Sequence, residues 1–175
     1  NEELDILAAE VVEKGIRHLA VAGKFATRNP EHERRIGDVL SSSGTIGSVS
    51  YSHALSGMLN FPRRAVTAFY NAAIGELHGR FADAVIEASK DIGGVEPLLL
   101  LAHGGSVPLN ASRALCVEAA NSGPAASVLG ILALEEKRLA EAESVLFCDI
   151  GGSTTDIALL AKGSPVTARE GITLG

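Results

Sequence analysis

The stretch LFCDIGGSTTDIALLAKG, Leu146–Gly163, decides how the rest of the chain is interpreted. It has the pattern of an apolar strand, a turn of small residues with an aspartate at each end, and a second apolar strand. The residues between the aspartates are glycine, serine and threonine. Such a turn either cradles a phosphate or simply joins two strands of a hairpin, and its composition alone leaves both interpretations open.

The residue types in this turn suit a nucleotide phosphate site. Glycines let the backbone approach a ligand closely and direct successive N–H groups toward an anion, and the hydroxyl side chains add further donors. Carboxylates at the end of a strand can hold a hydrated Mg²⁺ ion. No G-x-x-x-x-G-K-[ST] sequence occurs, so the turn is not a Walker-type loop. The candidate phosphate-binding residues are Gly151, Gly152, Ser153 and Thr154, and the candidate catalytic residues, which would hold Mg²⁺ through water, are Asp149 and Asp156.

Composition narrows the class of protein. The chain has 175 residues, enough for one domain or for parts of two, and its 46% hydrophobic content allows a sizeable core. Aromatic residues are few, which favours alternating helices and buried strands over a β-sandwich. The net charge is −6 without a basic stripe, which argues against a nucleic-acid partner. The sequence has neither a signal peptide nor a membrane-length apolar run, so we expect a cytoplasmic protein without a membrane partner.

The two cysteines, Cys116 and Cys148, do not form a C-x-x-C pair. Both lie in apolar surroundings of the sequence, and we expect two buried thiols, with a disulfide as the alternative.

The hydrophobic pattern predicts alternating helices and strands. Helices are expected within residues 3–14, 28–40, 63–89 and 121–143. Asn29 is the expected cap of the second, with Pro30 as its first helical residue, and Ser122 is the expected cap of the last. Strands are expected over 18–23, 48–55 and 97–106, the last as a central parallel strand buried on both faces. This order predicts an α/β fold with a mostly parallel sheet and a β-hairpin at the C-terminal end. The apolar stripe expected on the longest helix consists of Val66, Phe69, Ala73, Leu77, Phe81, Val85 and Ala88.

A second glycine-containing segment ends the apolar run at 97–106. In open α/β sheets the carboxyl ends of strands face the ligand crevice. His103, Gly104 and Gly105 are therefore candidate crevice or substrate residues, together with Ser122 at the start of the next helix. A plain strand-to-helix turn is the alternative.

Several polar residues lie where a helix or strand does not favour them. Arg63 and Arg64 open the longest helix, against its dipole, which predicts an acidic partner within the fold in preference to an anionic ligand. Asn71 in the middle of that helix predicts a specific hydrogen bond. His53 either serves in acid–base chemistry or is a structural histidine, which we favour. The remaining histidines show no zinc-ligand spacing.

Two sequence blocks carry a resemblance to known families. CDIGGSTTDIALL, 148–160, resembles the second phosphate motif, D-[IL]-G-G-G-T-x-D, of the actin, sugar-kinase and heat-shock-chaperone ATPase superfamily, with Ser153 in place of the third glycine. SGPAASVLG, 122–130, followed by DIGGSTTD, 149–156, is similar to the S-G-P-A-A-G-V-x-G and D-x-G-G-T-[ST]-T-D blocks of the hydantoinase A / 5-oxoprolinase family. Less specific sequence blocks upstream extend this similarity, which then runs from about Val21 to Gly175.

The resemblance implies a partial actin-like ATPase (ribonuclease H-like) fold. Residues 1–120 would be an α/β portion of the first lobe, and 121–175 a connecting helix and the hairpin that begins the second lobe. It also implies ATP and Mg²⁺ as cofactors, a cyclic amide such as a hydantoin or 5-oxoproline as substrate, hydrolysis as the reaction, and a second, B-type subunit as a candidate partner. The alternatives are an acetone-carboxylase-type ATP-dependent subunit and a non-catalytic actin-like nucleotide-binding module.

The resemblance also implies a longer protein. Family members carry a first phosphate motif far upstream and adenosine contacts downstream, and neither is present in these residues. The chain begins at Asn1 without Met and stops at EGITLG, in what looks like the middle of a strand or turn. We therefore expect a segment with half of a nucleotide site, inactive in isolation.

Overall fold

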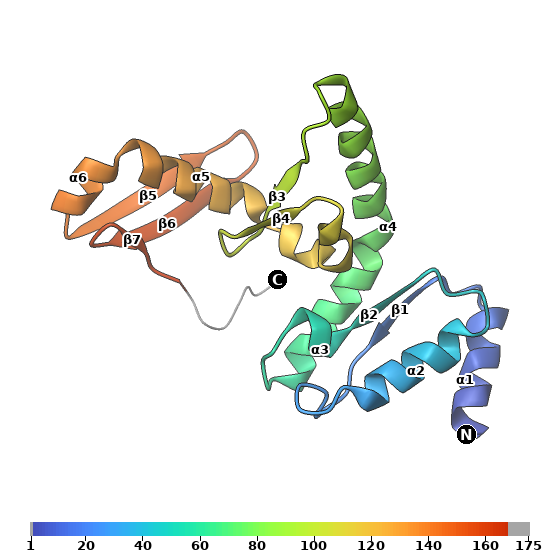
Figure 1. Ribbon diagram of the computed structural model, residues 1–175. Helices are drawn as coiled ribbons and strands as arrows, with labels where there is room; N and C mark the ends of the chain where they lie inside the picture. The colour runs from blue at the N-terminus through green and yellow to red at the C-terminus, as the bar shows by residue number, and fades with distance from the viewer. Residues whose placement is uncertain (1, 168–175) are drawn as a thin grey trace. The chain divides into compact units, whose positions relative to one another are not determined.

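The computed structural model describes residues 2–167, and the chain divides into two compact units (Figure 1). The first unit comprises residues 1–99 and 107–117, and the second comprises residues 100–106 and 118–175. The end of the chain, where the sequence suggested a strand or turn, lies outside the described residues.

The first unit is built from helices around one pair of strands. Its elements are α1 (Glu2–Glu13), β1 (His18–Val21), α2 (Glu31–Ser41), β2 (Ser48–Tyr51), α3 (Ser52–Leu55), α4 (Phe61–Asp91) and the 3-10 turn η1 (Ala111–Ala114). A second such turn, η2 (Cys116–Ala119), follows at the boundary of the unit. The strand expected over 48–55 thus ends at Tyr51, and the chain turns at once into a short helix.

Local hydrogen bonds set where the helices begin. The side chain of Asn29 accepts a bond from Glu31 N (3.0 Å), but the capping position is Pro30, so α2 starts one residue later than predicted. Asn60 caps α4 by accepting from Arg63 N (3.2 Å), with a proline in the first turn.

The strands β1 and β2 run parallel, with His18 opposite Ser48 and Val21 opposite Tyr51. Helices α2 and α4 each contact both strands. Asn71 of α4 donates to Ser50 Oγ (3.0 Å) and accepts from Val117 N (3.0 Å), which confirms the predicted specific bond. This helix therefore connects the strand pair to the 3-10 turns through a buried amide.

The apolar stripe predicted for α4 is not the face of the helix that is buried. Val66, Phe69 and Leu77 are 53%, 61% and 64% exposed, and Phe81 is also exposed. The buried residues of α4 are mostly small or polar and comprise Arg64, Ala68, Asn71, Ala72, His78 and Ala82. Small side chains let the helix approach the strands closely, and this close approach determined which face is buried.

The predicted central strand over 97–106 is also wrong. Only Leu98–Leu100 forms a strand, β3, which joins β4 (Ser106–Pro108) in a two-stranded sheet. Leu98 is 63% exposed, so among the described residues this run is not buried on both faces.

The second unit is a hairpin with a helix along it. Helix α5 (Ser122–Leu134) is followed by α6 (Glu136–Glu141), so the helix predicted over 121–143 is interrupted at Glu135. Strands β5 (Ser144–Ile150), β6 (Thr155–Ala161) and β7 (Ser164–Pro165) form an antiparallel sheet in that order.

The mixed α/β class and the C-terminal hairpin are confirmed, but the described residues form three small sheets and not one mostly parallel sheet. Both cysteines are free, with Cys116 buried as expected. Cys148 is exposed, against expectation, because alternation along β5 places it on the open face. Within residues 2–167, no helix is long and apolar enough to span a membrane.

Candidate functional site

The hairpin brings its two aspartates face to face. In the antiparallel register of β5 and β6, Asp149 is directly opposite Asp156. Directly opposed residues project from the same face of a sheet, with Cβ atoms about 4.5–5.5 Å apart. Both side chains are half-buried, on the face shared with Phe147 and the buried Leu160. Like charges in this position repel each other, so the pair favours a cation between or beside the carboxylates.

Helix α5 supplies a hydroxyl group to this pair. Ser127, in the second turn of α5, donates from Oγ to Asp149 Oδ2 at 2.7 Å. Ser127 was not among the residues that the sequence pattern predicted for the site. The only available signal was the serine at a position where the S-G-P-A-A-G-V-x-G pattern has glycine, and that comparison alone does not reveal a contact with a residue 22 positions later.

The turn between the aspartates is open to solvent. Gly151 N donates to Thr154 O (2.9 Å), so this amide closes the turn and is not free to bind an anion. A Cβ built on Gly152 would meet no atom within 4 Å, and its φ is not in the left-handed region. Neither backbone conformation nor packing therefore requires glycine at 152, which leaves close approach of a ligand as a physical reason for it. Ser153 and Thr154 are exposed beside it.

The N-terminal end of α5 lies toward this turn (Figure 1). Ser127 near the helix start contacts Asp149 near the turn, whereas Leu139 of α6 approaches Gly163 at the other end of the hairpin. The residue before the helix is Asn121, with φ 61° and no side-chain capping bond, so the predicted cap at Ser122 is wrong by one position. The positive end of the helix dipole therefore lies at the same end of the hairpin as the turn, which favours an anion there.

The donor set fits hydrated Mg²⁺. Mg²⁺ commonly keeps several waters and takes one or two protein carboxylates together with substrate phosphates. Asp149 and Asp156 supply two carboxylates, and the turn supplies space and hydroxyls for phosphates. Among residues 2–167, no cluster of three or more His, Cys, Asp or Glu could hold a metal. This part of the chain therefore does not surround a metal ion with protein ligands alone.

The loop at His103 has a local explanation. Gly105 N donates to His103 Nδ1 (3.2 Å), and a Cβ on Gly105 would lie 2.5 Å from the ring. Gly104 has φ +87° and faces Leu129 of α5. The turn itself therefore requires both glycines, and in the described residues no hydrogen bond joins this loop to the aspartate pair.

Residues 64–175 match the protein family described as hydantoinase/oxoprolinase. The chain belongs to this family. Among solved structures, it is similar to a nucleotide-free structure of acetone carboxylase, an enzyme of ATP-dependent acetone carboxylation. The TM-score is 0.77 at 22% identity, over 93% of this chain and 23% of that chain, so this likeness concerns the fold. No curated protein matches the chain.

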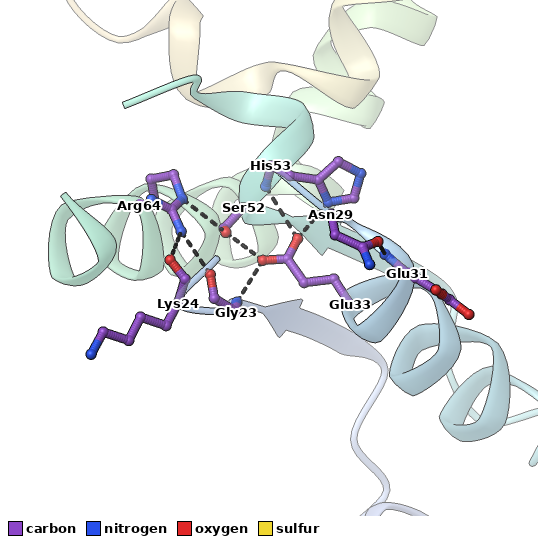
Figure 2. Close-up of polar contacts among 8 residues, drawn as sticks. All are labelled: Gly23, Lys24, Asn29, Glu31, Glu33, Ser52, His53 and Arg64. Atoms are coloured by element: carbon purple, nitrogen blue, oxygen red, sulfur yellow. Dashed lines mark hydrogen bonds and ion pairs between the residues drawn. The ribbon is translucent and has the colours of Figure 1, made fainter. Parts of the chain in front are cut away.

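This hydantoinase/oxoprolinase-family chain holds a second polar cluster in its first unit, around the fully buried Glu33 (Figure 2). Glu33 Oε1 accepts from Gly23 N (2.6 Å) and Ser52 Oγ (2.5 Å). Its Oε2 accepts from His53 N (3.1 Å) and faces His53 Nδ1 (2.5 Å). Burial alone raises the pKa of Glu33, but the hydrogen bonds from Ser52, His53 and Gly23 outweigh it and hold the pKa below its ordinary value.

Arg64 closes this cluster from the start of α4. Its guanidinium is buried and donates to the carbonyls of Met58 (2.6 Å) and Gly23 (2.6 Å), and from Nε to Ser52 Oγ (3.4 Å). Arg64 thus finds its partners within the fold, but they are carbonyls and a hydroxyl and not the acidic group that was expected. Ser52 links Arg64 to the carboxylate of Glu33. The family match begins at Arg64, so Glu33 and Ser52 lie outside the matched range. The cluster explains His53 as a structural partner of Glu33.

Proposed function

We propose that this chain is the part of an ATP-dependent enzyme that holds the nucleotide phosphates, and that the enzyme opens a cyclic amide of the hydantoin or 5-oxoproline type. The observation that carries the proposal is the pair of opposed carboxylates, Asp149 and Asp156, beside an open glycine turn at the N-terminal end of a helix. Membership of the hydantoinase/oxoprolinase family supports the substrate class. We further propose that the fold is a partial actin-like ATPase fold, with the second lobe beginning at about residue 121.

Each residue of the hairpin has a distinct task in this proposal. Asp149 and Asp156 hold the waters of Mg²⁺, which neutralises phosphate charge when bound. The hydroxyls of Ser153 and Thr154 donate to phosphate oxygens, and Gly152 allows the backbone to come close. Gly151 shapes the turn, because its N–H is bonded to Thr154 O.

The chemistry follows from the stability of an amide toward water. Transfer of the γ-phosphoryl group to the amide oxygen releases ADP and makes the carbonyl carbon electrophilic. Water then adds to that carbon and the ring C–N bond breaks, with the ring nitrogen taking a proton, which leaves an acyl phosphate. A second water hydrolyses the acyl phosphate to the carboxylate and free phosphate. The hairpin would contribute by positioning the phosphates and neutralising their charge, since the barrier to phosphoryl transfer is mainly electrostatic.

A second candidate function is ATP-dependent carboxylation of a small ketone. The similarity to acetone carboxylase, with a TM-score of 0.77, favours it, and the same hairpin would serve both reactions. A second, B-type subunit would then be the partner to seek. The chain covers 23% of the acetone carboxylase chain, so the remainder of the protein decides between the two reactions.

The test is an ATP-hydrolysis screen of the full-length protein. Hydantoins and 5-oxoproline are compared with acetone plus bicarbonate, and the products are identified as a ring-opened acid or a β-keto acid. We expect ADP formation that depends on a cyclic amide and on Mg²⁺, and its loss in Asp149→Asn. Stimulation by acetone and bicarbonate alone would replace the first candidate with the second. Full activity in Asp149→Asn would remove the hairpin from the proposal. Robust Mg²⁺-dependent turnover by the isolated 175 residues would instead overturn the expectation that they hold only half of a nucleotide site.

A further inference from the structure

We propose that Ser127 is a positioning residue that fixes the carboxylate of Asp149 in the orientation needed for the hydrated cation. This inference rests on the proposed function of the hairpin. It assigns the site a residue on α5 that lies outside the glycine turn and outside the aspartate pair.

The geometry leaves the two oxygens of Asp149 in different situations. Oδ2 accepts the hydroxyl of Ser127 at 2.7 Å, in a half-buried position between α5 and β5. Oδ1 has no hydrogen-bond donor among the described residues, so it is the oxygen available to a metal-bound water. A hydrogen bond to an ionised carboxylate is stronger than a neutral one, and the helix that carries Ser127 is a rigid support.

The orientation of Asp149 needs support because the two carboxylates of the pair repel each other when no cation is bound. Asp149 faces Asp156 directly, and without a third group the two carboxylates would rotate apart to relieve repulsion. The Ser127 hydroxyl lowers the negative charge density on Asp149 and restricts its χ rotation. The carboxylate is therefore pre-oriented before the cation arrives, so less ordering remains to be done on binding.

The serine also distinguishes this chain from the pattern it resembles. SGPAASVLG has Ser127 where S-G-P-A-A-G-V-x-G has glycine, and a glycine cannot make this bond. Restoring glycine is therefore the sharpest perturbation of the inference, because it removes the hydroxyl and introduces a residue that the helix position accepts in the related pattern.

The experiment compares Ser127→Gly, Ser127→Ala and Ser127→Thr in the full-length protein. Mn²⁺ binding is followed by electron paramagnetic resonance in the presence of a non-hydrolysable ATP analogue, and ATPase activity is measured against Mg²⁺ concentration. We expect Gly and Ala to weaken Mn²⁺ binding and raise the half-saturating Mg²⁺ concentration about 10-fold, the low end for partners of metal ligands. Thr, which keeps the hydroxyl, should restore both values, and kcat at saturating Mg²⁺ should change little. Ser144→Ala, an exposed serine of the same sheet, is the matched control.

Three outcomes have defined meanings. If Gly and Ala lower the melting temperature without changing cation dependence, Ser127 is only a structural link between α5 and β5, and the inference is overturned. If Thr behaves like Ala, a hydroxyl is not what matters, and the inference is again overturned. If Asp149→Asn also leaves Mn²⁺ binding unchanged, the proposed function of the hairpin itself has failed, which is distinguishable from failure of Ser127 alone.

Discussion

Replacing Glu33 by Gln is the substitution whose effect the structure determines most closely. The Glu33 carboxylate accepts four hydrogen bonds, two on each oxygen. Gln retains one acceptor oxygen, which can keep the bonds from Gly23 N and Ser52 Oγ as neutral bonds. Its amide NH₂ then faces His53 N–H, a donor against a donor, while the His53 ring can change tautomer and accept at Nδ1.

The magnitude follows from these losses. A buried donor left without an acceptor costs about 1–3 kcal/mol, and each bond that becomes neutral loses part of its charge-assisted strength of about 1.5–3 kcal/mol. We expect the free energy of unfolding of the first unit to fall by about 3 kcal/mol, a large part of the roughly 5–15 kcal/mol of a typical domain. At a urea slope of about 2 kcal/mol per molar, the unfolding midpoint should fall by about 1.5 M.

Tyrosine fluorescence provides the assay. The chain has no tryptophan, and its two tyrosines, Tyr51 and Tyr70, both lie in the first unit, so the signal reports the unit that contains Glu33. Glu31→Gln, an exposed change on the same helix, is the matched control. It should lower the midpoint by at most about 0.5 M, because a carboxylate in the first turn of a helix contributes about 0.3–1 kcal/mol. An unchanged midpoint for Glu33→Gln would refute the reasoning that the carboxylate organises this cluster.

The pH dependence gives an independent check with a fixed sign. The pKa of Glu33 is lowered in the folded protein, so its contribution to stability is present above the ordinary glutamate pKa of about 4.3 and is lost as the pH falls through the folded value. The stability difference between wild type and Glu33→Gln should therefore shrink below about pH 4.3. A difference that stayed constant down to strongly acidic pH would contradict the assignment of an ionised Glu33.

Three further predictions concern the hairpin and the thiols. Without divalent cations, Asp156→Asn should stabilise the second unit by about 0.2–1 kcal/mol, because it removes the charge opposite Asp149; a lower melting temperature in EDTA would count against this. Gly152→Ala should preserve the melting temperature but weaken ATP binding in titration calorimetry of the full-length protein, and an unchanged Kd would exclude close phosphate approach at this residue. In the 175-residue chain, Ellman's reagent should react with Cys148 in the folded state and with Cys116 only after unfolding, since burial raises the pKa of Cys116; equal rates would contradict this.

The local sequence pattern was sufficient to predict the hairpin. An apolar run on each side of a short glycine-rich turn predicts two antiparallel strands, and a turn of this length places Asp149 opposite Asp156. A polar residue at an unfavourable helix position likewise predicted the hydrogen bond of Asn71. For Arg64 it predicted partners within the fold but the wrong kind of group, because carbonyls and a hydroxyl take the place of the expected carboxylate. Features that depend on a few neighbouring residues were therefore predictable.

Features that depend on packing between distant parts of the sequence could not be predicted. Periodicity found the apolar face of α4, but it cannot tell whether large residues such as Phe69 or small ones such as Ala68 contact the strands. The apolar run at 97–106 likewise gives no information on which strands flank it, and β3 is only three residues long. The bonds from Ser127 to Asp149 and from Ser52 to Glu33 join residues 22 and 19 positions apart, and no sequence periodicity encodes them.

The two carboxylate sites of this chain illustrate how structure separates a stabilising role from a functional one. Glu33 is fully buried, and four donors match its two oxygens, so its charge is satisfied by the protein itself. Among residues 2–167, Asp149 has one donor, Ser127, and it faces the like charge of Asp156 beside an open turn. The first unit thus surrounds a carboxylate with hydrogen-bond donors, whereas in the second unit two carboxylates face each other with few donors. Such a local conflict is expected where a ligand supplies the missing partner, and here that partner is a cation with an attached phosphate.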